Sequence, residues 1–562
     1  MSKQLIECVP NFSEGRDLNI IKQITDEIES VEGVKLLDVD PGKATNRTVV
    51  TFVGEPEPVI EAAYLAMKKA AEVIDMSKHS GEHPRMGATD VCPLIPIANI
   101  TMDEVVKYAH QLGERAGRTL EIPFYMYEAA ATRPEWQNLA TIRSGEYEAL
   151  PEKLTDPEWK PDYGPSKFNS RAGATAIGAR DFLIAYNVNL NTTSVRRANS
   201  IAFDVREQGR VKRKGNPITG AIMKDKDGNA KRKPGTCKAV KGIGWYIEEY
   251  GVAQISMNLT NINLTPLHKA FEECCKSANK RGIRVTGSEL VGLVPLKVML
   301  DTGKYFLQKQ QRSVGVSEEE IIKIAIKSLG LDELGPFDPK KKIIEYQLEG
   351  ADAAPLLHMS LREFSNETAS ESMAPGGGSI SAYVGALGVS LATMVANLSS
   401  HKRGWDDQWE TFSDWAIKGQ ENKDALLKLV DEDTNAFNAI IEAFRMPKGN
   451  ANEVATRKEA IQAATRFAIE VPLQVMRESL KTFDIIKAMA KIGNPNSITD
   501  AGVGALCARA AVHGAFMNVK VNTGNLEDAK FVAKVLKEGK RLAAKADKLE
   551  KEVRKLVEAK IG

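Results

Sequence analysis

The chain has 562 residues, of which 43% are hydrophobic and 27% are charged, and its formal net charge is +2. A single hydrophobic core stops growing at about 250–300 residues, so this length predicts two or three domains. The balanced charge excludes the strongly basic composition that many nucleic-acid-binding proteins have, and we expect no nucleic acid as a partner.

The six cysteines form no CxxC pair and no regular framework. This usage favours reduced thiols in the cytoplasm over a disulfide scaffold or a structural zinc site, and we expect no metal. The N-terminal residues begin like a strand and lack a charged segment followed by a long apolar one, so we expect no signal peptide.

Short β-like runs alternate with helical patterns in the first 346 residues. In the first part we expect strands at 4–9, 34–39, 48–53, 91–97 and 122–127, and helices at 18–30, 57–73 and 102–116. The order strand, helix, strand, strand, helix, strand is that of a ferredoxin-like split βαβ layer. We assign this first subdomain to residues 1–180.

A similar order recurs at residues 181–346, with a hairpin predicted around Tyr250 and Gly251. The other elements expected there are strands at 182–190 and 283–287 and helices at 194–207 and 266–280. Each sheet has one face that needs a cover. We therefore expect an α/β half made of two ferredoxin-like subdomains whose sheets face each other across a cleft.

Residues 210–233 interrupt the second subdomain. They are crowded with Lys, Arg, Gly and Asp and have no apolar periodicity. Such a segment is typical of a solvated surface insertion, and the alternative is a basic arm that attracts anionic ligands.

After a linker at residues 347–357, the pattern becomes helical and predicts an all-α domain at 358–562. We expect long helices at 380–401, 422–444, 452–491, 499–518 and 526–559. Residues 380–398 carry no charge and are about long enough to span a bilayer. Their many Gly, Ala and Ser residues favour a buried helix in a soluble bundle, and we expect no membrane as a partner.

The segment 75–90 reads DMSKHSGEHPRMGATD and gathers His79, Glu82, His83 and Arg85 in one loop. A histidine titrates near neutral pH and can take and return a proton in one catalytic cycle. Asp40 lies at the end of a predicted strand, where its carboxylate could orient a histidine or simply begin a turn. The alternative for the loop is a polar turn with a structural histidine.

A second loop has the aromatic, hydroxyl and cationic groups that suit a flat anionic ligand. Its candidate binding residues are Gly164, Pro165, Ser166, Lys167, Phe168, Asn169, Ser170, Arg171, Ala172 and Gly173. No phosphate-binding GxxxxGK[ST], zinc-binding HExxH or nucleophile-elbow GxSxG motif occurs in the sequence. These absences argue against a nucleotide hydrolase, a zinc protease and an α/β-hydrolase.

In the helical half, Asp433 interrupts an apolar stripe at helical spacing that includes Val430, Phe437 and Phe444. Burial raises the pKa of a carboxyl group, as a general acid at neutral pH requires. We expect Asp431 to point toward the polar side instead. The alternative for Asp433 is a paired carboxylate or a cap on another helix.

Two glycine- or asparagine-rich helix starts could complete a pocket around Asp433. The first contains Gly376, Gly377, Gly378 and Ser379, whose backbone N–H groups suit an anion or a polar ring edge. The second contains Asp500, which is favourable at the positive end of a helix dipole. Ordinary helix capping is the alternative for both.

Several long strings together resemble glutamate formimidoyltransferase. They are CVPNFSEGR (8–16), DVDPGKATNRTV (38–49), GEHPRMGATDVCP (81–93), IRSGEYEALP (142–151) and YGPSKFNSRAGATAIGAR (163–180). With APGGGS (374–379) and the second aspartate of LVDED, nearly the whole chain resembles the formimidoyltransferase-cyclodeaminase family. Animal members carry Trp where this chain has Arg171, and the insertion at 210–233 is a further departure.

The resemblance implies a bifunctional folate enzyme of histidine degradation. His83 would be the catalytic histidine, Asp40 its support, Gly164 to Gly173 the folate loop, and Asp433 the proton donor of the second reaction. Tetrahydrofolate would be a co-substrate, and it could carry a polyglutamate tail. The family also implies a homo-oligomer with separate transferase and cyclodeaminase interfaces. Alternatives are a methenyltetrahydrofolate cyclohydrolase in the helical domain and a non-catalytic folate-binding scaffold.

Overall fold

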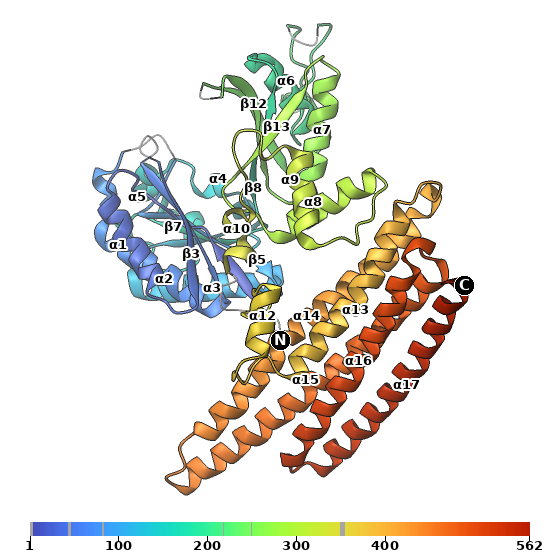
Figure 1. Ribbon diagram of the computed structural model, residues 1–562. Coiled ribbons are helices and arrows are strands. Elements are labelled where there is room, and N and C mark those ends of the chain that lie inside the picture. Colours follow the sequence, from blue (N-terminus) through green and yellow to red (C-terminus); the bar gives the residue numbers. More distant parts are fainter. Residues whose placement is uncertain are drawn as a thin grey trace. The chain divides into compact units, whose positions relative to one another are not determined.

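The computed structural model describes residues 4–42, 46–80, 84–216, 219–226, 228–248, 250–348 and 354–561. The chain forms two compact units. The first comprises residues 1–298 and 329–348, and the second comprises residues 299–328 and 349–562. The first unit is α/β and the second is helical, as the sequence predicted (Figure 1).

A seven-stranded sheet organises the first part of the α/β unit, in the order β1-β4-β2-β5-β7-β6 with β3 paired to β4. Its strands are β1 (Leu5–Cys8), β2 (Asn11–Phe12), β3 (Val34–Gly42), β4 (Arg47–Gly54), β5 (Thr89–Ala98), β6 (Phe124–Glu128) and β7 (Thr175–Ala179). The order β3-β4-β1-β5 is ferredoxin-like, and the parallel strands β7 and β6 extend it.

One face of this sheet packs on α1 (Leu18–Glu29), α2 (Pro56–Val73) and α3 (Met102–Leu120). Side chains alternate along a strand, so Ile6 and Cys8 enter this core while Glu7 points to the opposite face. The Asp17 carboxylate caps α1, and Thr101 and Glu104 form a capping box on α3. These caps place the helix starts close to where the sequence predicted them.

The second sheet of the α/β unit repeats the topology with the order β11-β12-β8-β13. Its elements are β8 (Ile184–Leu190), α6 (Val195–Val205), β11 (Val240–Ile247), β12 (Val252–Leu259), α7 (Leu267–Asn279) and β13 (Val285–Val291). The turn between β11 and β12 contains Gly251 at a φ of +64°, a value that favours glycine. The facing of the two sheets stays a prediction.

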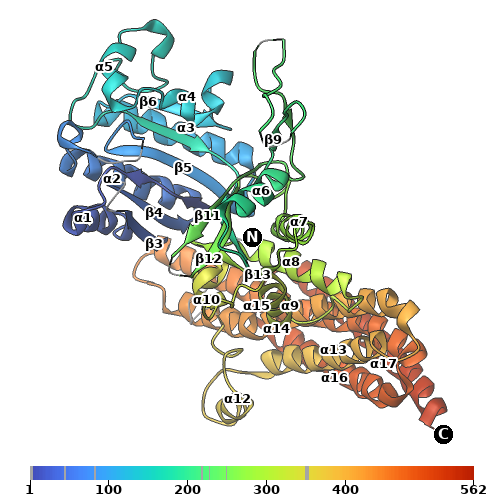
Figure 2. The same ribbon diagram turned by 90° about the horizontal axis from the view of Figure 1, so that it is seen from above.

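The basic insertion folds beside α6 as a small antiparallel ladder, with β9 (Arg210–Val211) paired to β10 (Arg232–Lys233). Backbone hydrogen bonds from Lys214 to Ala221 and from Lys231 to Met223 continue the ladder outward. In Figure 2 the chain around β9 extends away from α6. The expectation of a surface segment therefore holds, but the segment has regular backbone pairing.

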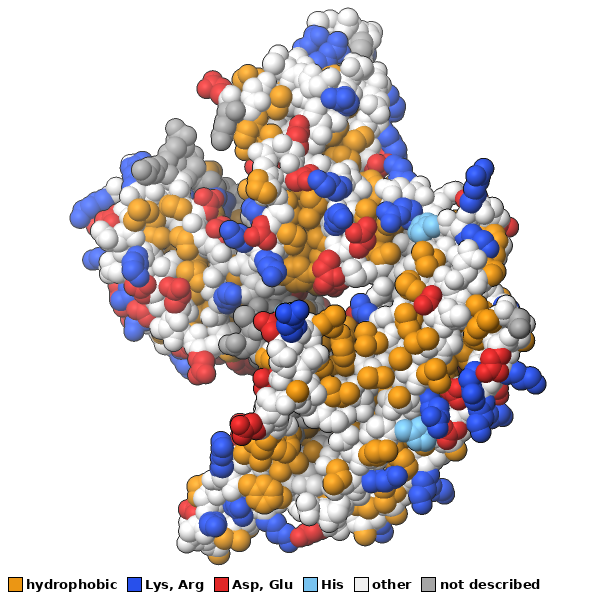
Figure 3. All heavy atoms as spheres, in the orientation of Figure 1, with side chains coloured by type: hydrophobic (Ala, Val, Ile, Leu, Met, Phe, Trp, Pro, Cys, Tyr) orange, Lys and Arg blue, Asp and Glu red, His pale blue; other side chains and the backbone are white. Residues whose placement is uncertain are grey.

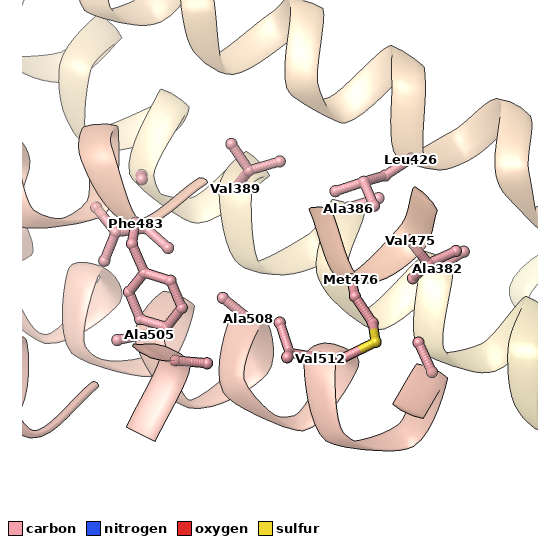
Figure 4. Packing of buried hydrophobic residues seen from close by; sticks show 14 of the residues in the cluster. Ala382, Ala386, Val389, Leu426, Val475, Met476, Phe483, Ala505, Ala508 and Val512 are labelled. Atoms are coloured by element: carbon pink, nitrogen blue, oxygen red, sulfur yellow. The ribbon is translucent and has the colours of Figure 1, made fainter. Parts of the chain in front are cut away.

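The helical unit is built on five long helices. They are α13 (Gly377–Ser400), α14 (Trp409–Arg445), α15 (Ala451–Ile492), α16 (Ile498–Asn522) and α17 (Ala529–Ile561). Small residues on α13 let its neighbours approach, and Val389, Leu426, Met476, Phe483 and Val512 meet in the core (Figure 4). Among the described helices, α13 alone is long and apolar enough to cross a membrane, but 61% of its most apolar window is buried.

Residues 299–328, which we assigned to the second subdomain from the sequence, belong to the helical unit. They contain most of α8 (Leu296–Lys309) and α9 (Glu318–Leu329). The loop between these helices packs on the bundle, where the Val314 N–H donates to Ser413 Oγ at 3.1 Å. A Cβ atom on Gly315 would clash with Ala416, so this contact requires glycine.

Candidate functional site

Two of the sequence strings lie side by side in the α/β unit. The Ala88 N–H donates to the Ala172 carbonyl at 2.8 Å, and the Ala174 N–H donates to the Met86 carbonyl at 2.9 Å. Gly173, at a φ of +69°, faces Gly87 across this pairing, and a Cβ on Gly173 would clash with the Met86 carbonyl. The histidine-containing loop and the candidate folate loop are therefore neighbours.

Asn46, which belongs to the string at 38–49, links the string at 8–16 to the histidine-containing loop. Its side-chain oxygen accepts from the Gly15 N–H at 3.1 Å, and its amide group donates to the Ser80 carbonyl at 3.0 Å. Asn46 is buried and has a φ of +49°, a conformation that asparagine adopts more readily than most residues. This role was not predicted from the sequence, although the position of Asn46 after a turn-forming run was a usable signal.

His79 is fixed as a neutral ring. Arg85 Nε–H donates to His79 Nδ1 at 3.2 Å, so the ring proton is on Nε2, which lies 2.8 Å from the Asn46 carbonyl. Burial lowers the pKa of His79, and the Arg85 charge lowers it further. Arg85 also binds Glu146 at 3.1 Å and Glu148 at 2.7 Å. With both nitrogens engaged, His79 is a structural residue.

His83, the predicted catalytic histidine, and its neighbour Glu82 lie outside the described residues. Asp40 lies on β3 opposite Val49, with an exposed side chain. Burial, and then the nearby Asp40 charge, raise the pKa of Asp38 on the same strand. The proposed support of His83 by Asp40 stays a prediction.

The candidate folate loop offers an exposed surface between two anchored ends. Phe168 packs on Tyr147 with ring centroids 5.5 Å apart, and the Tyr147 hydroxyl donates to the Ser170 carbonyl at 2.6 Å. Arg171 donates to the Glu72 carbonyl at 2.6 Å, near the C-terminus of α2, where a cation is favourable. In this structure Arg171 anchors the loop.

Glu7 is a buried acid that was not predicted from the sequence. It lies in the middle of β1 with 3% of its surface exposed. Burial raises the pKa of Glu7 to about 7, the Arg180 charge opposes this rise, and the Glu345 charge adds to it. A glutamate inside an apolar strand was the available signal.

Replacing Glu7 by Gln is expected to stabilise the α/β unit at pH 8 and to have little effect near pH 4.5. In the unfolded state the Glu7 carboxyl releases its proton near pH 4.5, whereas in the folded state it keeps the proton up to about pH 7. The stability of the wild-type protein therefore falls as pH rises from 4.5 to about 7. The shift corresponds to about 3 kcal/mol. Calorimetric unfolding at pH 5 and pH 8 measures this, and exposed Glu29→Gln is the control. An equal gain at both pH values would contradict the assignment.

In the helical unit, Asp433 on α14 reaches the first turn of α13. Its Oδ2 accepts from the Ser379 N–H at 2.9 Å and from the Ser379 hydroxyl at 3.2 Å. The N-cap residue of α13 is Gly376, which has no side chain to cap it. Burial raises the pKa of Asp433, while the two Ser379 hydrogen bonds oppose the rise. Asp433 therefore caps α13 and is also a candidate general acid.

The predicted apolar stripe on α14 holds only in part. Val430 is fully buried, but Phe437 and Phe444 are exposed. Asp431, which we expected on the polar side, is 5% exposed, because the segment before α12 (Leu361–Thr368) covers it. Asp431 Oδ1 accepts from the Leu356 N–H at 3.0 Å, and Oδ2 has no hydrogen-bond partner among the described residues.

The structure does not bring Asp500 to Asp433 within one chain. A Cβ on Gly377 would lie 3.3 Å from Asn518 near the C-terminal end of α16, whereas Asp500 is in the first turn of that helix. Asp500 and Asn518 are 18 positions apart, which corresponds to about 27 Å of helix. Asn518, which the sequence did not single out, takes the place predicted for Asp500.

Gly378→Ala is expected to lose the activity of the Asp433 site, and Gly376→Ala is its matched control. A Cβ on Gly378 would clash with the Asp433 carboxylate, whereas one on Gly376 would meet only the Met373 carbonyl, at 3.9 Å. Overpacking of this kind costs about 1–3 kcal/mol and would displace the acid. Assays of the helical unit's reaction and thermal unfolding measure both effects. Equal behaviour of the two variants would contradict this geometry.

Comparisons with known proteins cover nearly the whole chain. Three family models match: "Formiminotransferase domain, N-terminal subdomain" at residues 5–180, "Formiminotransferase domain" at 185–349, and "Formiminotransferase-cyclodeaminase" at 360–541. The chain is 43% identical to a mouse formimidoyltransferase-cyclodeaminase over 96% of this chain and 98% of that protein. It is 43% identical to a Streptococcus pyogenes glutamate formimidoyltransferase over 54% of this chain and 94% of that protein. A Methylorubrum extorquens methenyltetrahydrofolate cyclohydrolase is 33% identical over 36% of this chain and 98% of its own length.

Proposed function

Since the chain belongs to the formiminotransferase-cyclodeaminase family, we propose that its two reactions use separate sites, one around His83 and one around Asp433. The chain is a bifunctional folate enzyme of histidine degradation. It transfers the formimino group from N-formimino-L-glutamate to tetrahydrofolate, which yields 5-formiminotetrahydrofolate and glutamate. It then cyclises this intermediate to 5,10-methenyltetrahydrofolate and releases ammonia.

In the first reaction, N5 of tetrahydrofolate attacks the formimino carbon. His83 removes the N5 proton and returns a proton to the glutamate nitrogen as the bond from that nitrogen to carbon breaks. The neighbouring His79 is not suited to this task, because Arg85 donates to its Nδ1 and the Asn46 carbonyl accepts from its Nε2. The adjacent loop from Gly164 to Gly173 would hold the folate in register.

In the second reaction, N10 attacks the same formimino carbon, and the amino group leaves as ammonia. Asp433 protonates this amino group, and burial favours its neutral, proton-bearing form. The observation that carries this proposal is the half-buried Asp433 carboxylate at the glycine-lined start of α13. Gly376, Gly377 and Gly378 would present their backbone N–H groups to the substrate, while the Ser379 N–H holds Asp433 in place.

A second candidate function for the helical unit is cyclohydrolase activity, which the similarity to the Methylorubrum extorquens enzyme favours. Ammonia separates the possibilities. When the protein is given formiminoglutamate and tetrahydrofolate, the proposed function predicts one ammonia for each methenyltetrahydrofolate formed. Stopped-flow absorbance measures the methenyltetrahydrofolate, and an ammonia assay measures the ammonia. Turnover of methenyltetrahydrofolate without ammonia would support the cyclohydrolase, and no turnover would support a non-catalytic scaffold.

Self-association through the helical unit is also proposed. α13 exposes Leu387, Met394 and Leu398 at spacings that place them on one helix face, and α16 exposes Val503 and Leu506. Hydrophobic side chains gather along this part of the bundle in Figure 3. Exposed apolar faces of this kind are typical of protein interfaces, so we propose that one helical unit pairs with its copy.

Two finer points belong to the same proposal. The folate would carry a polyglutamate tail, held by cationic side chains such as Arg171 or those of the basic insertion. A cytoplasmic location is proposed because no disulfide joins any of the six cysteines, all of which lie within the described residues. The sulfurs of Cys8 and Cys92 are 3.5 Å apart without a covalent bond.

A further inference from the structure

The basic insertion and α6 enclose a cavity of about 430 Å³ in the α/β unit. Its described lining contains no Asp or Glu and six arginines: Arg196, Arg197, Arg206, Arg210, Arg213 and Arg232. Like charges repel, so such a grouping is unfavourable unless something neutralises it.

Two of these arginines are held in place by the protein. Arg206 donates to the Gly242 carbonyl at 3.2 Å, and its guanidinium lies 4.1 Å from the Phe203 ring centroid. Burial lowers the pKa of Arg206, and the charges of Arg232 and Arg210 lower it further. Arg210 differs, because Asp204 binds it at 2.7 Å. Arg206 therefore keeps a charge that none of its hydrogen-bond partners neutralises.

The side chains of three other arginines make no hydrogen bond or ion pair with another described residue: Arg196, Arg197 and Arg232. Arg196 and Arg197 lie in the first turn of α6, and this turn contains no acidic residue. The N-terminal end of a helix is positive and favours anions, so cations there are unfavourable. An anion in the cavity would reverse this penalty.

Close backbone contacts hold the two ends of the insertion together beside the cavity. Gly209 has a φ of +61°, and a Cβ there would clash with the Lys233 carbonyl, so the start of the insertion passes close to its end. The Lys212 N–H donates to the Lys231 carbonyl at 2.8 Å. Arg213 is directed by a hydrogen bond to the Gly220 carbonyl at 2.9 Å. This pairing positions arginines from both strands around one space.

We propose that this cavity binds a small flexible polyanion with three or more oxyanion groups in a row. Guanidinium groups bind phosphate and carboxylate oxygens in pairs, and the volume is in the range of about 300–1,000 Å³ typical of small-molecule sites. A phosphate chain and a γ-linked glutamate chain share this chemistry. The small concave space and the chain's net charge of +2 favour such a ligand over nucleic acid.

The test is isothermal titration calorimetry of the full-length protein with tripolyphosphate and, separately, with tetra-γ-glutamate. At least one probe is expected to bind at a single site, more weakly as salt rises. Arg197→Gln and Arg232→Gln are each expected to weaken binding at least tenfold. Lys231→Gln, an exposed cation on the same insertion that does not line the cavity, is expected to change it less than twofold.

The two probes distinguish the sources of the ligand. Preference for tetra-γ-glutamate would assign the cavity to a folate tail, and preference for tripolyphosphate would assign it to a phosphorylated effector. Failure of both probes to bind, equal losses in Lys231→Gln and Arg232→Gln, or tighter binding of a single-stranded oligonucleotide would overturn the proposal. Arg197→Gln and Arg232→Gln should both retain transferase activity with monoglutamyl tetrahydrofolate. Failure of this site is therefore distinguishable from failure of the proposed function.

Discussion

Asp433→Asn is expected to abolish ammonia release while formimino transfer continues. The amide can still accept a hydrogen bond from Ser379, but it cannot donate an acidic proton to the leaving amino group. General acid catalysis of this kind contributes about 10²–10⁴ in rate. The measurement is the ratio of ammonia to glutamate formed from formiminoglutamate and tetrahydrofolate, which should fall from one toward zero.

Asp431→Asn is the matched control two residues away on the same helix. Its Oδ1 accepts from the Leu356 N–H, and an asparagine oxygen can keep that bond. The control should therefore change ammonia release by less than about tenfold, well below the loss of a general acid. If Asp431→Asn stopped ammonia release and Asp433→Asn did not, the roles of the two aspartates would be reversed.

The second large effect is expected for His83→Ala, which should lower formimino transfer by about 10²–10⁴. Alanine cannot remove the N5 proton, whereas folate affinity depends on other groups and should remain. The helical unit should still release ammonia from supplied 5-formiminotetrahydrofolate. Quench-flow measurement of glutamate formation, together with equilibrium binding of tetrahydrofolate, separates chemistry from binding.

His79→Gln is the control for His83→Ala. Glutamine has both a donor and an acceptor, so it can partly replace the contacts of His79 with Arg85 and Asn46. A modest loss of transfer is expected, because the ring has a structural role. Full transferase activity of His83→Ala, with activity lost in His79→Gln, would place the proton-transferring histidine at position 79.

Much of the fold could be predicted because local periodicity matched the final packing. The five long C-terminal helices and both βαββαβ orders follow from apolar spacing and caps. β7 was missed because Thr175–Ala179 is short and rich in small residues, and its pairing with β5 and β6 is long-range. β-Structure depends on such partners more than helix does.

The site was predictable only in part. Long strings indicated which segments matter, and the structure brings the 84–90 and 163–174 segments together through backbone pairing. Sequence spacing could not show that Asp431 is covered by the segment at Leu356, because that contact joins residues 75 positions apart. It also could not show that α16 presents Asn518, and not Asp500, to the start of α13.

The most direct test of the two-site account is to divide the reaction between two variants. Asp433→Asn should convert formiminoglutamate and tetrahydrofolate to 5-formiminotetrahydrofolate, and isolated intermediate given to His83→Ala should yield methenyltetrahydrofolate with one ammonia for each molecule. Failure of His83→Ala to process that intermediate, or direct ammonia release by Asp433→Asn, would contradict separate sites.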